Sequence, residues 1–242
     1  MTQSKPQRLF LLDALRVFAI VMMIAYHFVY DLRYFGYVDW NTPLGNGFWQ
    51  WRTVILTCFI FAMGMSMGIA HGQQRDIRSF LKRLAQIAGC ACLITVMSLV
   101  MFSASWIYFG ILHFMVLGSV LTFALVGRRR LALFIGLAIL ISFWIGWVPQ
   151  RWPFMYISGL PSYTEDFVSP FPWFGVAILG LVVGDYLVNS PAVLTRLSKL
   201  KIAGRISGGI SLAGKKSLLI YMIHQPILFA LFFVVGFLGL AK

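Results

Sequence analysis

The sequence has few charged residues and very few acidic ones. Charged residues make up 11% of its 242 residues, against about 25% in soluble domains, and Asp and Glu together number only seven. Hydrophobic residues make up 60% of the chain, and the mean hydropathy is +0.85. This composition excludes a soluble globular protein and predicts a single integral-membrane domain over residues 1–242.

The sequence also lacks the patterns that mark common soluble catalytic sites. It contains no Walker loop, no dinucleotide fingerprint followed by an acidic residue, no HExxH motif and no nucleophile elbow. Its three cysteines lie in apolar segments, and their odd number and spacing favour packing roles over disulfides or a zinc site. We therefore expect no metal, and any chemistry must come from side chains that project into a helix bundle.

Apolar runs of about 20 residues recur along the whole chain, which predicts an all-α, polytopic transmembrane helix bundle of about seven spans. The first run is interrupted by Asp13 and Arg16 and is followed by no small-x-small cleavage site. It is therefore expected to stay in the mature protein and not to be removed as a signal peptide. The expected spans are residues 9–30, 48–70, 84–102, 107–126, 131–148, 171–188 and 217–240.

Basic residues fall mainly on one side of this predicted bundle. The opposite side holds only Arg33, Arg52, Arg151 and Lys242. By the positive-inside rule, the N-terminus is expected in the cytoplasm and the C-terminus outside. Topology thus accounts for the net charge of +13, and we expect no nucleic-acid partner. The basic residues on the predicted cytoplasmic side are Lys5, Arg8, Arg75, Arg78, Lys82, Arg83, Arg128, Arg129, Arg130, Arg196, Lys199, Lys201, Arg205, Lys215 and Lys216.

The first span carries ionisable groups on one face of its helix. The eleven-residue step from Arg16 to His27 is about three full turns, which places the two side chains on one face about 16 Å apart along the axis. Asp31 follows His27 by four residues on the same face. Ionisable groups at membrane depth usually face a protein interior or a wet cavity and mark a substrate or proton path. The structural alternative is a buried Asp13–Arg16 pair that only fixes helix packing.

Two more histidines fall inside predicted spans. The fourth span places His113 about 10 Å below its outer end, at a depth similar to that of His27. The seventh span places His224 in the inner half, followed by Gln225 and Pro226, and the proline is expected to free a backbone carbonyl near it. The alternative is that these histidines are hydrogen-bonded core residues.

Two segments on the predicted outer side are long enough to contribute to a site. Residues 31–47 contain Trp40, and residues 149–170 contain Asp166. Aromatic side chains beside acidic and amide groups suit a sugar ring or an amine. Tryptophans are also common at both membrane edges as interfacial anchors, so they indicate no ligand by themselves.

The inner end of the sixth span and two glycine pairs are expected to have structural roles. Asp185 is expected to form an interfacial ion pair with Lys215 or Lys216. The small-xxx-small spacings at 64–68 and 180–184 predict close helix packing. We assign no chemistry to the glycines.

Four segments, spread in order from residue 12 to residue 228, resemble one family. They are LDALRVFAIVMMIAYHFVYDL in the first span, YFGILHF in the fourth, EDFVSPFPWFG before the sixth and KKSLLIYMIHQPIL in the seventh. Together they resemble the bacterial branch of the heparan-α-glucosaminide N-acetyltransferase catalytic-domain family. The spacing from Arg16 to His27 also resembles the arginine-histidine motif of membrane acyltransferases that O-acetylate surface polysaccharides.

Two positions depart from the family pattern. Val17 stands where the family usually has Gly after the motif arginine, so the backbone is expected to pack less closely there. The lysosomal relatives have a catalytic histidine in the outer loop after the first span, whereas residues 32–50 contain no histidine. The catalytic histidine of the lysosomal relatives therefore has no counterpart in this segment.

The resemblance implies a multi-pass acetyltransferase of the bacterial inner membrane. It would move an acetyl group from cytoplasmic acetyl-CoA to an amine or hydroxyl of an extracytoplasmic acceptor, with a sugar as the expected class. In this interpretation His27 is the general base and Asp31 orients it. Arg16 would hold the donor or stabilise developing negative charge, and an acetyl-histidine intermediate fits the same residues.

Further binding residues follow from the same interpretation. His224 is a second candidate contact of acetyl-CoA, together with Arg16. The basic cytoplasmic loops would receive the phosphates of the coenzyme. His113, Asp166 and Trp40 are the candidate acceptor contacts.

Two other classes of function are open to a chain with this polar face. In a transporter or proton-coupled carrier, the intramembrane His, Asp and Arg would form a relay, but two matching halves and paired broken helices are missing. A non-catalytic scaffold would leave the polar face without a role. The lipid bilayer is the expected surrounding of the protein, and a homo-oligomer is compatible with the sequence.

Overall fold

The computed structural model describes residues 9–41, 45, 47–199 and 205–238. These residues form nine α-helices, one short 3-10 helix (η1) and one isolated parallel β-bridge between Phe109 and Phe167. The elements are α1 (Phe10–Tyr34), α2 (Phe48–His71), α3 (Ile77–Met101), α4 (Ile111–Leu125), α5 (Arg129–Trp144), η1 (Phe154–Tyr156), α6 (Pro170–Val188), α7 (Pro191–Lys199), α8 (Arg205–Lys215) and α9 (Ser217–Phe237).

Five of these helices, namely α1, α2, α3, α6 and α9, are long and apolar enough to cross a membrane. They coincide with the first, second, third, sixth and seventh expected spans, which confirms the prediction of a helical multi-pass membrane protein. Helix α4 is apolar but has only 15 residues, and α5 has 16. Seven crossings and a cytoplasmic N-terminus stay predictions. Lys5, Arg8, Lys201, Lys242 and the expected end of the last span lie outside the described residues.

Helix α3 begins seven residues before the third expected span, because Asp76 caps it. The Asp76 carboxylate accepts hydrogen bonds from the backbone N–H groups of Ser79 and Arg78 at 3.1 and 3.0 Å. These hydrogen bonds, led by that of Ser79, lower the pKa of the Asp76 carboxyl from its ordinary value of 3.8. Lys82 and Arg83, expected in a loop, therefore lie in the early turns of α3.

The segment expected as a long basic loop before the last span is also partly helical. It contains α7 and α8, and α8 packs along α1. A Cβ added to Gly214 would lie 2.8 Å from the Cβ of Asp13, so glycine is what allows this close approach. The loop prediction was wrong here, because polar residues in an amphipathic helix resemble a loop in a hydropathy reading.

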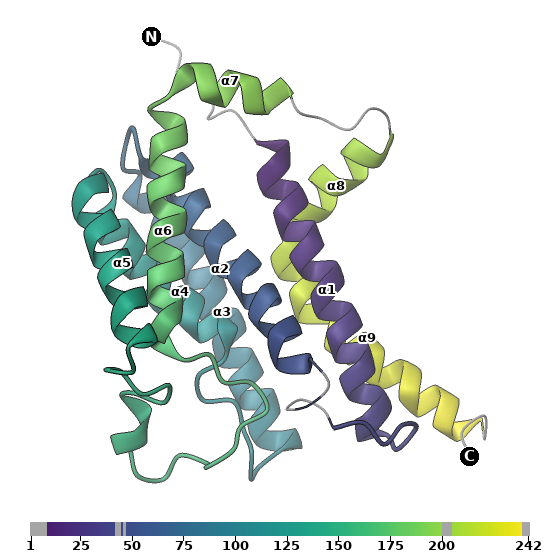
Figure 1. Ribbon diagram of the computed structural model, residues 1–242. Coiled ribbons are helices and arrows are strands. Elements are labelled where there is room, and N and C mark those ends of the chain that lie inside the picture. The colour runs from purple at the N-terminus through teal and green to yellow at the C-terminus, as the bar shows by residue number, and fades with distance from the viewer. Residues whose placement is uncertain (1–8, 42–44, 46, 200–204, 239–242) are drawn as a thin grey trace. The chain divides into compact units, whose positions relative to one another are not determined.

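The described chain divides into two compact units. One contains residues 60–197, and the other contains residues 9–59, 198–199 and 205–238. In the first unit α5 lies along α6, with α4 beside both (Figure 1). In the second unit α1 packs against α8 and α9. The prediction of one domain over the whole chain stays a prediction.

The glycines at 64–68 and 180–184 bring the backbones of α2 and α6 together. A Cβ at Gly64 would lie 1.9 Å from the carbonyl oxygen of Ala177, and one at Gly184 would lie 2.2 Å from that of Met65. No side chain fits at such distances. The prediction of close helix packing at these spacings is confirmed.

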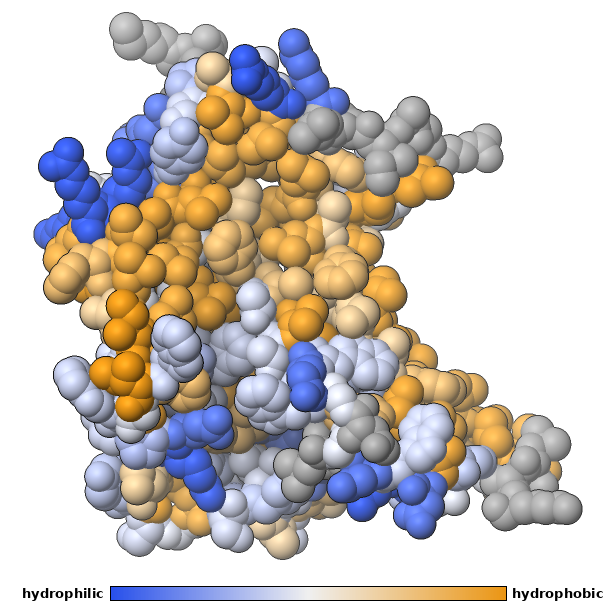
Figure 2. All heavy atoms as spheres, in the orientation of Figure 1, coloured by the Kyte–Doolittle hydropathy of each residue, from blue (hydrophilic) through white to orange (hydrophobic). Residues whose placement is uncertain are grey.

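The outer surfaces of the helices carry many large apolar side chains. Val100 is 82% exposed and Phe134 is 73% exposed. Hydrophobic side chains cover most of the helix surface in Figure 2, and hydrophilic side chains gather toward the helix ends. Large exposed apolar surfaces of this kind mark contact with a membrane or a partner, and the lengths of the helices favour a membrane.

Candidate functional site

The centre of the candidate site is a pair of histidines, His27 on α1 and His224 on α9, which we call the histidine pair. Their ring centroids lie 4.8 Å apart, with the ring planes at 69°. The expectation that His224 lies in the inner half and His27 near the outer mouth was therefore wrong. Gly214, near the end of α8, lies against Asp13 near the start of α1. His224 follows Gly214 by ten residues, and ten helical residues span about 15 Å. This distance brings His224 along α1 to the level of His27.

Each histidine of the pair is tethered through Nδ1 to a backbone carbonyl. His27 Nδ1 lies 2.9 Å from the carbonyl oxygen of Met23, and His224 Nδ1 lies 2.5 Å from that of Tyr221. A carbonyl oxygen can only accept, so Nδ1 carries the proton in both rings. In its neutral form each ring then presents Nε2 as a basic nitrogen, which is the arrangement that a general base requires.

Asp31 is fully buried, and its partner is Gln225 on α9. The Gln225 side chain donates from Nε2 to both carboxylate oxygens, at 2.9 and 3.1 Å. We call this contact the Asp31–Gln225 clamp. It joins α1 to α9 immediately beside the histidine pair, since Gln225 follows His224 in the chain. Orientation of His27 by Asp31 stays a prediction, because the contact that holds the imidazole here is the Met23 carbonyl.

Three buried polar atoms in this region have no hydrogen-bond partner among the described residues. They are His224 Nε2, Gln225 Oε1 and Trp51 Nε1. Trp51 belongs to an aromatic group around Tyr26, whose ring lies 5.6 Å from both the Trp51 ring and the His27 ring. Buried polar atoms are nearly always hydrogen-bonded in folded proteins, so such a cluster is typical of a site that binds a polar ligand.

Arg16 and Asp13 form an ion pair near the start of α1. The guanidinium Nη1 lies 3.4 Å from Asp13 Oδ1. Asp13 is almost fully buried, and the Arg16 side chain is 16% exposed. The pair anticipated as a structural alternative is thus present, and Asp13 holds the guanidinium on the face that also carries His27.

His113 belongs to the other unit, where both of its ring nitrogens are hydrogen-bonded. Nδ1 accepts from the backbone N–H of Gly110 at 3.3 Å, and Nε2 lies 3.0 Å from the Thr95 hydroxyl. The Thr95 hydroxyl in turn donates to the carbonyl of Ile107. This geometry makes His113 a capping residue of α4, and its role as an acceptor contact stays a prediction.

Asp166 shapes the same end of α4. Its Oδ2 accepts from the backbone N–H of Ile111 at 2.9 Å, and a Cβ at Gly110 would lie 2.5 Å from that oxygen. Nearby, Arg151 donates to the Tyr108 hydroxyl and to the carbonyls of Ser162 and Pro161. The expected outer segment 149–170 is therefore folded onto residues 102–110. Trp40, the third candidate acceptor contact, is 45% exposed.

Sequence reasoning missed two polar groups that the structure brings into view. The sequence indicates no role for Gln225, although this residue is the partner of Asp31. Nor does the sequence distinguish the fourth histidine, His71; its Nδ1 accepts from the backbone N–H of Asp76, and its ring packs against Phe80 and Phe123. The buried surroundings of His71 give it a structural role.

The described residues contain no group of three or more His, Cys, Asp or Glu side chains that could hold a metal ion. The three cysteines are free.

An integral-membrane helix bundle with two contacting imidazole rings defines a class of membrane protein that carries the groups for acid-base chemistry. Residues 8–226 match the family described as heparan-alpha-glucosaminide N-acetyltransferase, catalytic. This match covers most of the chain, so the protein belongs to that family, which is a family of acetyl-CoA-dependent N-acetyltransferases. Membership makes it a membrane acetyltransferase and sets aside the transporter and scaffold alternatives. No curated protein and no solved structure matches the chain.

Proposed function

We propose that this protein, a member of the bacterial branch of its family, lies in the bacterial cytoplasmic membrane. It transfers an acetyl group from cytoplasmic acetyl-CoA to an amine or hydroxyl of an acceptor on the other side, with a sugar as the expected class. The family match supports the reaction type. The excess of basic residues on one side of the predicted topology supports a cytoplasmic entry for an anionic donor.

The observation that carries the proposal is the histidine pair with its tethered Nδ1 atoms. The Met23 carbonyl fixes the proton of His27 on Nδ1, which leaves Nε2 to take a proton from the attacking amine or hydroxyl. His27 is partly exposed, whereas His224 is 8% exposed. We therefore assign proton removal to His27, and a supporting contact with the donor to His224, whose Nε2 can accept a hydrogen bond.

Arg16 and Asp31 support this chemistry from opposite ends of the polar face of α1. A preorganised guanidinium stabilises the negative charge that develops on a thioester oxygen during attack, and Asp13 holds Arg16 in place for this role. Asp31 and Gln225 join α1 to α9, which fixes the separation of the two imidazole rings. Catalytic groups must be held to within a fraction of an ångström for such a reaction.

The acceptor contacts are proposed on the expected outer side. Asp166 and Trp40 supply a carboxylate and an indole, the groups that suit an amine or a sugar ring. His113 contributes by capping α4, and so by holding the segment that carries Tyr108 and meets Asp166.

Two chemical routes use the same residues. In direct transfer, His27 Nε2 removes the acceptor proton while the acceptor attacks the thioester carbon, and the C–S bond breaks to release coenzyme A as the thiolate, which takes up the proton. In the two-step route, His27 Nε2 itself attacks the thioester carbon and releases the coenzyme A thiolate, which forms an acetyl-histidine; the acceptor then attacks the acetyl group and releases the imidazole. Rapid acid quench of enzyme mixed with labelled acetyl-CoA and no acceptor separates them, because only the second route leaves label on the protein.

The test of the proposed function is acetyl transfer by the purified protein. Labelled acetyl-CoA is supplied with a panel of amines and sugars, and transfer is measured for the wild type, His27→Ala and His71→Ala. His27→Ala is expected to lose about 10² to 10⁴ in rate. His71→Ala removes an imidazole outside the site and serves as the matched control. Equal rates in all three proteins, or no transfer by the wild type to any acceptor, would contradict the proposal.

A further inference from the structure

The end of α5 and the segment that follows it carry an exposed apolar surface. Within residues 144–157, Trp144 is 87% exposed, Trp147 is 78% exposed and Tyr156 is 74% exposed. Large apolar side chains gathered in this way mark contact with a membrane or a partner. We call this surface the aromatic lip, and its exposed side chains include Trp144, Ile145, Trp147, Met155, Tyr156 and Ile157.

The polar and inward-facing side chains of the lip are held by the rest of its unit. Arg151 is the only charged residue between positions 144 and 157. Its guanidinium donates to the carbonyl oxygen of Ser162 at 2.7 Å and to the Tyr108 hydroxyl at 3.1 Å. The Phe154 ring packs on the Phe109 ring, with centroids 4.5 Å apart. The lip is therefore fixed to the folded segments beside it, and its one charge is engaged by protein acceptors.

The packing of α5 along α6 shows which end of α6 the lip adjoins. Helix α6 is long and apolar enough to cross a membrane, and α5 lies along it. The Arg129 guanidinium, at the start of α5, lies 5.8 Å over the ring of Tyr186 near the end of α6. The Trp152 ring lies 5.5 Å from the ring of Phe171 at the start of α6. The two helices are thus antiparallel, and the lip adjoins the start of α6.

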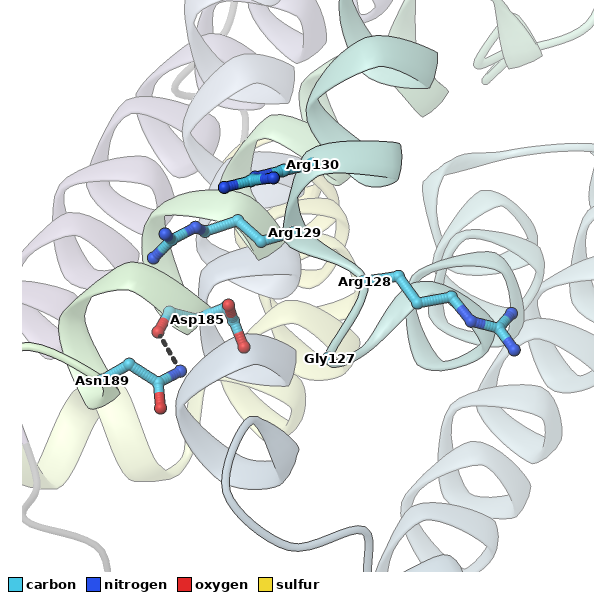
Figure 3. Close-up of a pocket in the computed structure, with 6 residues that line it drawn as sticks. All are labelled: Gly127, Arg128, Arg129, Arg130, Asp185 and Asn189. Atoms are coloured by element: carbon cyan, nitrogen blue, oxygen red, sulfur yellow. Dashed lines mark hydrogen bonds between the residues drawn. The ribbon is translucent and has the colours of Figure 1, made fainter.

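The opposite end of this helix pair is polar. The start of α5 and the end of α6 line a pocket there, and Figure 3 shows its charged and amide side chains, which are Arg128, Arg129, Arg130, Asp185 and Asn189. The helix from Arg129 to Trp144 rises about 22 Å, whereas the hydrocarbon core of a bilayer is about 30 Å thick. A membrane that begins at the arginines therefore extends as far as the lip.

We propose that the aromatic lip lies in the interfacial layer of the membrane, between the lipid headgroups and the hydrocarbon, on the predicted outer side. Trp and Tyr favour this layer because their rings are apolar and also carry a hydrogen-bonding group. The lip continues the exposed apolar face of α5, which includes Phe134 and Ile141. It is thus continuous with the surface that the helices present to lipid. This inference goes beyond the proposed function and does not depend on it.

A glycan and a second copy of the chain are the other candidates to cover the lip. A sugar requires polar partners beside the aromatic rings, whereas Ile145, Met155 and Ile157 offer none and Arg151 is engaged elsewhere. A second copy would have to match the shape of the lip. Lipid needs no matching shape and already adjoins the lip along α5, so lipid is favoured.

The position of the lip also sets the level of the segment that carries Asp166. Arg151 joins the lip to the carbonyl of Ser162. Asp166, further along the same segment, accepts a hydrogen bond from the backbone N–H of Ile111 at 2.9 Å. A lip in the headgroup layer keeps this segment next to the membrane surface.

The test places an NBD fluorophore on single cysteines of the full-length protein, after the three native cysteines have been replaced by alanine. Trp147→Cys and Tyr156→Cys report on the lip. Ser162→Cys is the matched control, because it replaces an exposed polar side chain of the same segment. Each protein is placed in nanodiscs of phosphatidylcholine, with or without a nitroxide near the top of the acyl chains. Iodide serves as the quencher from the aqueous side.

The two labels on the lip should lose most of their fluorescence to the nitroxide lipid and little to iodide, and the label at position 162 should show the reverse order. If iodide quenches the lip labels as strongly as the control while the nitroxide leaves them unchanged, the lip faces water, as a glycan platform would, and the proposal is overturned. If neither quencher acts, protein covers the lip and the proposal is also wrong. Energy transfer between labelled copies would then identify a second chain as the cover.

The native tryptophans provide a second measurement that needs no cysteine variant. The nitroxide lipid should quench a share of the tryptophan fluorescence, and the double variant Trp144→Phe, Trp147→Phe should lower that share. Both indoles are exposed, so phenylalanine removes them without disturbing the packing. Trp106→Phe, which replaces a half-buried indole of the same unit, should not lower the share. An unchanged share in the double variant would contradict the interfacial position of the lip.

Discussion

The Asp31–Gln225 clamp gives the most direct prediction about the stability of the candidate site. The perturbation is Asp31→Ala or Gln225→Ala, each of which removes one side of the contact. Asp31→Ala leaves the half-buried Gln225 amide without its acceptor, and Gln225→Ala leaves a fully buried carboxylate without its donor. Hydrogen bonds to charged groups contribute about 1.5–3 kcal/mol, and an unpaired buried group costs a similar amount.

Each single variant is therefore expected to unfold about 3–12 °C below the wild type, since about 1 kcal/mol shifts the midpoint by about 2–4 °C in a chain of this size. The double variant should be little worse than either single one, which corresponds to a coupling energy of about 1.5–3 kcal/mol. Asp31→Asn should be milder, because its new amide can donate to Gln225 Oε1, which has no partner among the described residues.

The assay is thermal unfolding of the purified variants in detergent, followed by tryptophan fluorescence. Gln86→Ala, which replaces an exposed glutamine on α3, is the control and should stay within about 0.5 kcal/mol of the wild type. Strictly additive losses for Asp31→Ala and Gln225→Ala would refute the reasoning, because they would show that the two side chains do not act on each other.

Three further predictions follow from particular contacts. Asp31→Asn should slow acetyl transfer in the wild type but have little further effect in His27→Ala if the two residues act as a unit; multiplicative losses in the rate assay would show that Asp31 acts elsewhere. Gly64→Val should destabilise the protein by at least about 1–3 kcal/mol, because its Cβ would meet the Ala177 carbonyl, whereas Gly89→Ala, with no atom within 4 Å of the new Cβ, should be neutral or stabilising in the same melting experiment. The lowered pKa of Asp76 means that its contribution to stability is present above about pH 4 and is lost as the pH falls through the lowered value; the melting temperatures of the wild type and Asp76→Asn should therefore converge below that pH, and a constant difference from pH 6 to pH 3 would contradict this.

Much of the fold could be predicted because the bilayer imposes a length on apolar helices. Five predicted spans match α1, α2, α3, α6 and α9, and the glycine spacings correctly indicated close packing of α2 and α6. The residues at which helices begin and end could be predicted less well from the sequence. The cap at Asp76 and the amphipathic α8 both place helix where polar residues suggested a loop.

The composition of the candidate site could be predicted better than its geometry. Periodicity alone placed Arg16, His27 and Asp31 on one face of α1. It could not place His224 against His27, because that depends on α8 running along α1 before α9 begins. Nor could it find Gln225 as the partner of Asp31, since an amide carries no charge or periodic signal of its own.

His113 shows a different limit. A histidine inside an apolar span has the same sequence signature whether it is catalytic or structural. Its two hydrogen bonds, to Gly110 and Thr95, come from a helix cap and from a neighbouring helix, so only the three-dimensional structure reveals them. The same reasoning applies to His71, which is held by Asp76.

We propose that acetyl groups cross the membrane through a site based on His27, and the side on which the acceptor is acetylated decides this. Protein is reconstituted into vesicles, labelled acetyl-CoA is added only outside, and the acceptor identified in the panel is placed either inside or outside. We predict label on acceptor trapped inside, no label on acceptor added outside, and loss of transfer in His27→Ala. Label on the outside acceptor alone would contradict transfer across the bilayer. Full activity of His27→Ala would show that the catalytic site is not based on His27.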